Sequence, residues 1–199
     1  MNWAVKECKV DIITMSFGFP SPIESISEAI KLAAFADIIM FAAASNDGGN
    51  SGRAFPASDS NAICIHSTDG KGNKSSFSPT HHETSLNFSV LGENVKSSWP
   101  MNADGICKKR KSGTSFATPI AVAIAANLLE YTRQKMSTMP KNLHARLRSG
   151  DGMRRVFTLM VRRKRDGYDY VTPEYLFGKG RTDRYIYETI QNALTLMWT

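Results

Sequence analysis

The sequence predicts an α/β fold in which a parallel sheet is flanked by helices. Residues 10–16 are a β-branched, nearly continuous apolar run and residues 38–44 are apolar throughout, as is typical of strands covered on both faces. The segment between them repeats apolar residues at helical spacing, so the three pieces form a βαβ unit with parallel strands. Residues 120–129 are apolar on nearly every side, which predicts a helix at the centre of the domain.

Size and composition favour one globular domain with a tail. The chain has 199 residues, of which 42% are hydrophobic, and this excludes a disordered protein. Its three cysteines, Cys8, Cys64 and Cys107, are too few and odd in number for a disulfide framework, and free thiols favour a reducing compartment. We expect no membrane partner, because no signal peptide opens the chain and no apolar run reaches the roughly 18 residues that span a bilayer. These features favour a cytoplasmic location, which a targeting segment upstream of these residues would change.

The net charge of +7 is concentrated in two basic runs. They are residues 108–111 and 162–165, with a further pair at 154–155. Short basic runs are usually solvated surface, and this is the favoured interpretation. Nucleic-acid binding is the alternative, but it is not expected, because no aromatic residues are interleaved with the charges on a recognisable module.

Residues 1–8 are typical of the end of a helix, and a second helix is predicted after the first strand. Ser21 supplies an N-cap, Pro22 the first helical position and Glu24 the partner of a capping box. This helix is expected to end near Asp37. Its apolar positions are Ile23, Ile26, Ala29, Ile30, Ala33 and Ala34.

The carboxyl ends of the two predicted strands are rich in glycine and polar residues. They are residues 16–18 and 45–49. Ligands of open α/β sheets bind beyond the carboxyl ends of the strands, so both segments are expected to face one crevice. Asn46 offers an amide donor at its edge, although local evidence alone favours an ordinary turn residue.

The middle of the chain is predicted as short strands and turns. Strands are expected at 62–67, 87–91 and 95–98, a short extended piece at 75–78, a turn at 69–73 and a basic loop at 108–111.

Ser115 lies where a nucleophile would be well supported. A helix is predicted to begin near Ser115 and to run to about Arg133, with Pro119 in its first turn, where a missing N–H costs little. The free N–H groups and the positive end of the helix dipole at this point would stabilise an oxyanion. A Ser or Thr helix cap without any catalytic role fits this stretch equally well.

Four separated segments together resemble the subtilisin-like serine proteases. Residues 42–48 (AAASNDG) resemble the family's A-A-A-G-N-x-G segment, and residues 55–57 (FPA) its Y-P-A turn. Residues 113–119 (GTSFATP) match its G-T-S-x-A-x-P nucleophile motif, and residues 3–18 resemble the helix and strand that lead to its substrate-binding edge. The segments follow the family's order between residues 3 and 133, which implies a subtilisin-like fold.

The resemblance implies a serine-type endopeptidase. Ser115 would attack a peptide carbonyl, while its own N–H and the side chain of Asn46 would hold the oxyanion. The implied substrate-binding residues are an edge that pairs with an extended peptide, Ser16, Phe17 and Gly18, and a wall of the primary specificity pocket, Ala43, Ala44 and Ser45. The family usually has Gly in place of Ser45, so a narrower pocket is expected.

The catalytic Asp and His of the family are missing from this chain. Their motifs, D-[ST]-G and H-G-T-x-V-A, should lie upstream of Ser16. In subtilisin, a member of the family, loss of the His alone lowers turnover about two million-fold, so we expect the isolated chain to be inactive. The histidines, none of which has the family's context, are His66, His81, His82 and His144.

We therefore expect a sheet that is incomplete at its N-terminal side. The expected partners are a peptide or protein substrate and the missing N-terminal part of the same domain; no cofactor or metal is expected. The alternative is a non-catalytic peptide-binding or regulatory pseudoprotease module, which keeps the crevice without the chemistry.

Residues 1–136 are predicted to be the C-terminal part of the catalytic domain, and residues 137–199 a basic, partly helical extension. After a break at Pro140, a helical stripe is expected from Met153 to Val161, and 168–177 is expected to be an irregular docking segment. A final amphipathic helix is predicted from Tyr185, Ile186, Thr189, Ile190, Ala193, Leu194 and Met197. Packing of this extension against the domain is the favoured role, and a partner-binding surface is the alternative.

Overall fold

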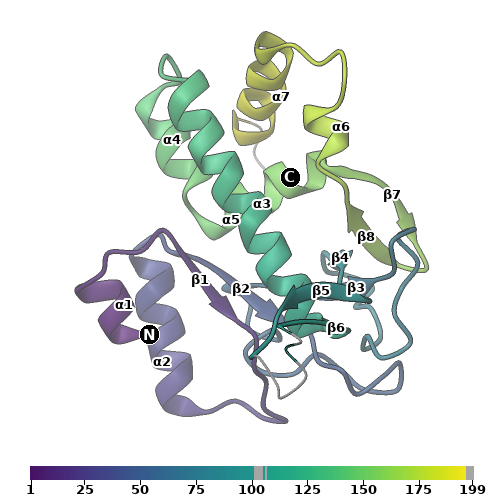
Figure 1. Ribbon diagram of the computed structural model, residues 1–199. Helices are drawn as coiled ribbons and strands as arrows, with labels where there is room; N and C mark the ends of the chain where they lie inside the picture. The colour runs from purple at the N-terminus through teal and green to yellow at the C-terminus, as the bar shows by residue number, and fades with distance from the viewer. Residues whose placement is uncertain (101–104, 106, 196–199) are drawn as a thin grey trace.

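Residues 1–100, 105 and 107–195 are described by a computed structural model, with the main chain alone at 162–164. They form one six-stranded sheet with helices on both faces, and a separate two-stranded ribbon (Figure 1). The strands of the sheet follow the order β1-β2-β3-β4-β8-β7, and the first five are parallel. The predicted α/β fold with a parallel sheet is confirmed.

The helices and strands are short except for α3. They are α1 (Asn2–Lys6), β1 (Ile12–Met15), α2 (Glu24–Phe35), β2 (Ile39–Ala43), β3 (Ala62–Thr68), β4 (Phe88–Leu91), β5 (Val95–Ser98), β6 (Lys108–Lys111), α3 (Thr114–Lys135), α4 (Lys141–Leu147), α5 (Gly150–Leu159), β7 (Val161–Arg165), β8 (Tyr168–Val171), α6 (Glu174–Phe177) and α7 (Asp183–Thr195). Among the helices of the described residues, none is both long and apolar enough to cross a membrane.

Alternate residues of the central strands face two separate cores, as expected for a sheet covered on both sides. On one face, Phe41 of β2 and Ile63 of β3 pack with α3, α4, α5 and α7. On the other face, Met40 and Cys64 pack with α1 and α2. The helix α3 therefore lies over the sheet, with a buried stripe that recurs every three or four residues: Ala117, Ala121, Ala125 and Leu128.

The predicted N-cap of the second helix is wrong. The N-cap of α2 is Ile23, which is extended at φ −110° and ψ 120°, and its side chain makes no capping hydrogen bond. Ser21 precedes a proline, which disfavours the helical conformation at Ser21, and the helix begins only at Glu24. The Ser21 hydroxyl therefore lies too early to cap the free N–H groups.

Three further local predictions are corrected by the structure. Residues 75–78 form a turn, in which the Ser78 N–H donates to the Ser75 carbonyl at 3.0 Å. The basic run 108–111 is not a loop but the strand β6, antiparallel to β5. Residues 168–177 are not irregular, because they form β8 and α6, and β8 pairs with β4.

Residues 137–195 add two strands to the sheet and share its larger core. The main chain of β8 is placed by Asp169, whose carboxylate accepts a hydrogen bond from the Asn87 N–H at 2.8 Å. The predicted stripe from Met153 is the buried side of α5, but Val161 already belongs to β7. The buried residues of α7 are Ile186, Ile190 and Leu194, whereas the predicted position 197 lies outside the described residues.

His66 is fully buried in β3. Its Nε2 lies 3.7 Å from the Cys64 sulfur, and the edge of the Tyr168 ring packs against it. Burial lowers the pKa of His66 to about 3, with smaller effects in the same direction from Arg53 and His81. Burial likewise raises the pKa of the Cys64 thiol to about 12, so both side chains are neutral and form no thiolate–imidazolium pair.

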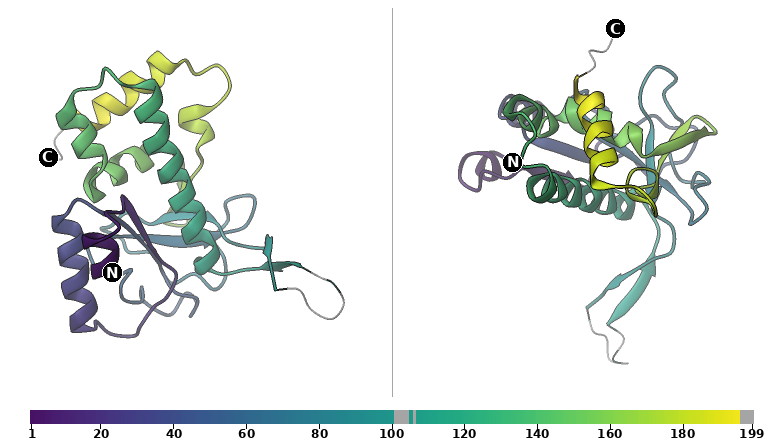
Figure 2. Two further views of the ribbon diagram at one scale, coloured as in Figure 1. Left: turned by 60° about the vertical axis from the view of Figure 1, so that its left-hand side comes forward. Right: turned by 90° about the horizontal axis from the view of Figure 1, so that it is seen from above.

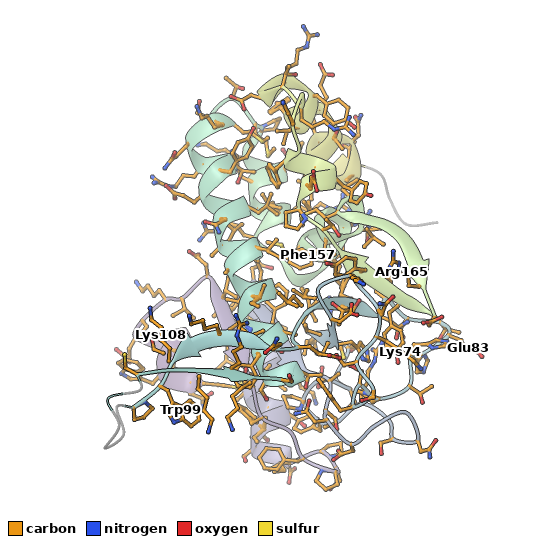
Figure 3. All side chains as sticks on the ribbon, turned by 45° about the vertical axis from the view of Figure 1, so that its right-hand side comes forward. Lys74, Glu83, Trp99, Lys108, Phe157 and Arg165 are labelled. Atoms are coloured by element: carbon orange, nitrogen blue, oxygen red, sulfur yellow. The ribbon has the colours of Figure 1, made fainter. Side chains whose placement is uncertain are left out.

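We expect Phe157→Ala to lower the free energy of unfolding by about 3–5 kcal/mol. The Phe157 ring is fully buried where α5 meets the sheet (Figure 3), and its centroid lies 5.5 Å from that of Phe41 and 5.6 Å from that of Phe88. Denaturant unfolding measures the change. Phe35→Ala is the control, since Phe35 is 91% exposed and its loss should cost little. Equal effects of the two variants would show that α5 does not pack on the sheet.

We also expect His66 to make stability depend on pH. In the unfolded chain His66 binds a proton below about pH 6.5, whereas in the folded chain its pKa is about 3. The free energy of unfolding therefore falls as pH falls from about 6.5 to about 3. Between pH 7 and pH 5 the expected loss is about 2 kcal/mol. Denaturant unfolding at both pH values should show this loss in the natural sequence and in His82→Gln, but not in His66→Leu. An unchanged slope in His66→Leu would contradict the burial of a neutral imidazole.

Candidate active site

The N-terminus of α3 holds Ser115 at the carboxyl end of the sheet. Ser115 is the second residue of the helix, so its N–H has no intrahelical acceptor, and it has none elsewhere in the described part of the chain. The N-cap is Gly113, whose φ of 155° is rare for residues with a side chain, and its N–H donates to the Gly92 carbonyl at 2.9 Å. Ser115 therefore presents both a hydroxyl and an N–H without an acceptor at the start of α3.

Asn46 is oriented by the same helix terminus. Its Oδ1 accepts hydrogen bonds from the N–H of Thr114 at 2.8 Å and from the Thr114 hydroxyl at 3.1 Å. Because a backbone N–H can only donate, the oxygen of the amide must face Thr114. The other end of the amide is then the NH₂ group, a donor, which lies beside Gly113. This is the orientation that an oxyanion donor needs.

Ser16 makes two hydrogen bonds with Ser115 of α3. The Ser115 hydroxyl donates to the Ser16 carbonyl at 3.4 Å, and the Ser16 hydroxyl donates to the Ser115 carbonyl at 3.2 Å. The second contact follows from Pro119, which has no N–H to bond the carbonyl four residues before it. Pro119 is the sixth residue of α3 and therefore lies in its second turn, so the prediction that it lies in the first turn is wrong.

A cleft of about 550 Å³ opens beside Ser115. Of the eight site residues expected from sequence, six line it: Phe17, Gly18, Ala43, Ser45, Asn46 and Ser115. Ser16 and Ala44 are not among its lining residues. Ala44 is fully buried, and its carbonyl accepts from the Ala54 N–H at 2.8 Å, so it supports the wall of the cleft from behind.

Ser45 and Asp47 close one side of this cleft. The backbone of Ser45 has a φ of 136°, where a residue with a side chain is strained and glycine is not. Its hydroxyl donates to the Asp47 carboxylate at 2.5 Å, and the Asp47 N–H donates back to that hydroxyl at 3.1 Å. Sequence reasoning missed Asp47, although its position next to Asn46 was a signal that an acid enters the cleft.

Arg53 supplies the other charge of the cleft and was also missed. Its guanidinium donates to the Leu86 carbonyl at 2.9 Å and to the Asn87 side chain at 2.7 Å, which fix the cation in place. The lining therefore contains one acid, Asp47, and one base that is permanently charged. Arg53 cannot take a proton from Ser115 because it is already protonated, and the Ser115 hydroxyl donates to the Ser16 carbonyl and not to Asp47.

Within the described residues, no histidine lines the cleft. His66 is buried in β3, and the His81 ring packs on Tyr168. His82 contacts the hydroxyls of its own loop, and His144 contacts the Met136 carbonyl at 3.2 Å in a separate groove. The hydroxyl of Ser115 thus has no basic partner among these residues. No group of three or more His, Cys, Asp or Glu placed to hold a metal ion occurs in the same described part of the chain.

Comparison with known proteins supplies the context of this arrangement. The model of the subtilase family matches residues 1–167. Among curated proteins, the chain is 34% identical over 141 residues to subtilisin-like protease het-Q2 of Podospora anserina, covering 68% of this chain and 38% of that protein. It is 31% identical over 126 residues to subtilisin BL of Lederbergia lenta, covering 63% of this chain and 44% of that protein.

The structure of the prenylagaramide maturation protease PagA shares the fold. It superposes with a TM-score of 0.66 at 20% sequence identity and covers 98% of this chain and 65% of that one. The chain spans less than half the length of the two curated relatives, subtilisin-like protease het-Q2 and subtilisin BL.

The family match also extends past residue 133, where the resemblance of the motifs ends. Together with the parallel sheet and the placement of Ser115 and Asn46 around one cleft, the match over residues 1–167 shows that the chain belongs to the subtilase family.

Proposed function

We propose that this chain supplies the nucleophile, the oxyanion hole and part of the substrate cleft of a serine-type endopeptidase. The observation that carries the proposal is the convergence of three groups at one end of the cleft. They are the hydroxyl and N–H of Ser115 and the amide of Asn46, whose oxygen is held by Thr114. Family membership and the names of the relatives support proteolysis as the reaction.

In this mechanism an extended peptide lies along Phe17 and Gly18, which line the cleft. The Ser115 oxygen attacks the scissile carbonyl carbon, and the negative charge moves to the carbonyl oxygen. The Ser115 N–H and the Asn46 NH₂ group donate to this oxyanion, which is held more tightly than the ground-state carbonyl. The side chain before the scissile bond enters the part of the cleft whose wall includes Ala43 and Ser45.

The proton of Ser115 needs an acceptor, and the residues that the structure describes do not provide one at this site. The Ser16 carbonyl, which now accepts the hydroxyl, is not a useful base. We therefore propose that the Asp and His of the triad come from polypeptide outside these residues. The isolated chain then keeps only the small rate advantage of the oxyanion hole, about 10³–10⁴ over water.

A non-catalytic peptide-binding or regulatory module is the second candidate. The observation that favours it is again the contact of the Ser115 hydroxyl with a backbone carbonyl, which leaves the cleft formed but the nucleophile unactivated. Such a module would bind a peptide without turning it over.

We expect a labelled fluorophosphonate probe to react with Ser115 only when a base is supplied. Residues 1–199 alone should not be labelled stoichiometrically. The same residues joined behind a segment that carries the D-[ST]-G and H-G-T-x-V-A motifs should be labelled, as detected by mass spectrometry of the peptide that contains Ser115.

Two variants of the completed protein serve as controls, one for labelling and one for peptide hydrolysis. Ser115→Ala should abolish it, and Asn46→Ala should slow peptide hydrolysis about 10²–10³-fold through loss of one oxyanion donor. Labelling of residues 1–199 alone would show that a base already lies within them. A completed protein that binds peptide without labelling or turnover would favour the non-catalytic module.

A further inference from the structure

The ribbon of β5 and β6 projects from the body of the molecule. In both views of Figure 2 it extends away from the sheet and from the helices, and it makes no part of either core. We call its described residues, 95–99 and 107–111, the basic arm. An antiparallel ladder holds the arm together, with Lys96 opposite Arg110.

The basic arm carries an unbalanced positive charge. It contains five cations and no acid: Lys96, Lys108, Lys109, Arg110 and Lys111. No ion pair involving these five cations occurs within 1–100, 105 and 107–195. The register also places two like charges directly opposite each other, which weakens the ribbon unless an anion lies nearby. The arm is therefore suited to a negatively charged partner.

Trp99 decides between two kinds of anionic partner. Its ring is 43% exposed, and the ammonium groups of Lys109 and Lys111 lie 5.1 Å and 5.2 Å from the ring centroid. Figure 3 shows Trp99 and Lys108 together on the arm, at the edge of the molecule. A nucleic-acid base that stacked on the ring face under these ammonium groups would displace them and lose their cation–π contacts. Carboxylates, in contrast, can pair with these lysines without displacing them.

The base of the arm adjoins the candidate active site. The Asn94 N–H, just before β5, donates to the Ser112 hydroxyl at 2.9 Å. Ser112 follows β6 and lies three residues before Ser115. A polypeptide that occupies the cleft therefore has its neighbouring residues close to the arm. Main-chain groups on the outer edges of β5 and β6 are further available to an extended segment.

We propose that the basic arm binds an acidic polypeptide segment of the protein whose chain enters the cleft. The inference rests on the proposed function only in taking that occupant to be a polypeptide. It adds a selection by charge outside the cleft. Within the cleft, the negative charge of Asp47 is matched by the positive charge of Arg53. It requires no turnover, so binding can be measured on the chain as it is.

The test is the binding of fluorescent peptides to the full chain, measured by anisotropy. A Glu-rich peptide should bind, and the same peptide with Gln at every Glu should not. Raising the salt from about 0.05 M to about 0.5 M should weaken the binding, because exposed charges are screened. The triple variant Lys96→Gln, Lys108→Gln, Arg110→Gln should weaken it about tenfold, as expected for three exposed charge contacts.

The matched control removes the same charge elsewhere. Lys31→Gln, Lys141→Gln and Lys179→Gln replace three exposed lysines of α2, α4 and the loop before α7, and binding should be unchanged. Circular dichroism shows whether either triple variant remains folded. Equal losses in the two variants would show that net charge alone attracts the peptide, and would overturn the proposal.

Two other results would also overturn it. Tighter binding of a single-stranded oligonucleotide than of the Glu-rich peptide, lost in the arm variant, would assign the arm to nucleic acid. Binding of the Gln peptide as tightly as the Glu peptide would assign recognition to the cleft alone. These outcomes are independent of the fluorophosphonate test, so the arm and the catalytic proposal can fail separately.

Discussion

Two hydrogen bonds from Thr114 to Asn46 join the start of α3 to the end of β2, and the geometry of the candidate site depends on this joint. The first turn of a helix has N–H groups without partners, and the Asn46 amide oxygen satisfies one of them. The same contact leaves the NH₂ group, beside Gly113, as the end of the amide that can donate. The contacts with Thr114 thus anchor the helix terminus and fix the orientation of the Asn46 amide.

Close packing between two glycines makes this joint possible. A Cβ on Gly92 would lie 2.4 Å from the Ser67 hydroxyl and 2.9 Å from the Gly113 carbonyl, which is impossible without movement. The chain that leaves β4 therefore passes directly against the turn that precedes α3. Any side chain at Gly92 would push the helix terminus away from β3, and with it Ser115 from Asn46. The site consequently depends on a position that has no chemistry of its own.

The motifs of the site could be predicted because each is local. The run at 38–44 is apolar at every position, which predicts a buried strand, and the small residues around Ser115 predict a helix terminus. What could not be predicted depends on distant partners. β8 exists because it pairs with β4, and Asp169 accepts from Asn87, which lies 82 residues earlier in the chain. In the same way, the run at 108–111 is a strand only through its pairing with β5, since four consecutive cations show no alternation.

The sequence by itself determined the class of fold and the family, and it predicted Ser115 as the nucleophile and Asn46 as the oxyanion donor, because strand runs, a helix start and short motifs are properties of neighbouring residues. Only the tertiary structure decided that Ala44 supports the cleft from behind, that Ser16 is bound to the Ser115 main chain, and that Asp47 and Arg53 enter the lining. It also decided that the basic run beside Ser115 stands out from the body as one strand of a ribbon. These features are set by the directions in which side chains leave elements far apart in the chain. No local pattern records such directions, since they follow from the packing of α3 on the sheet.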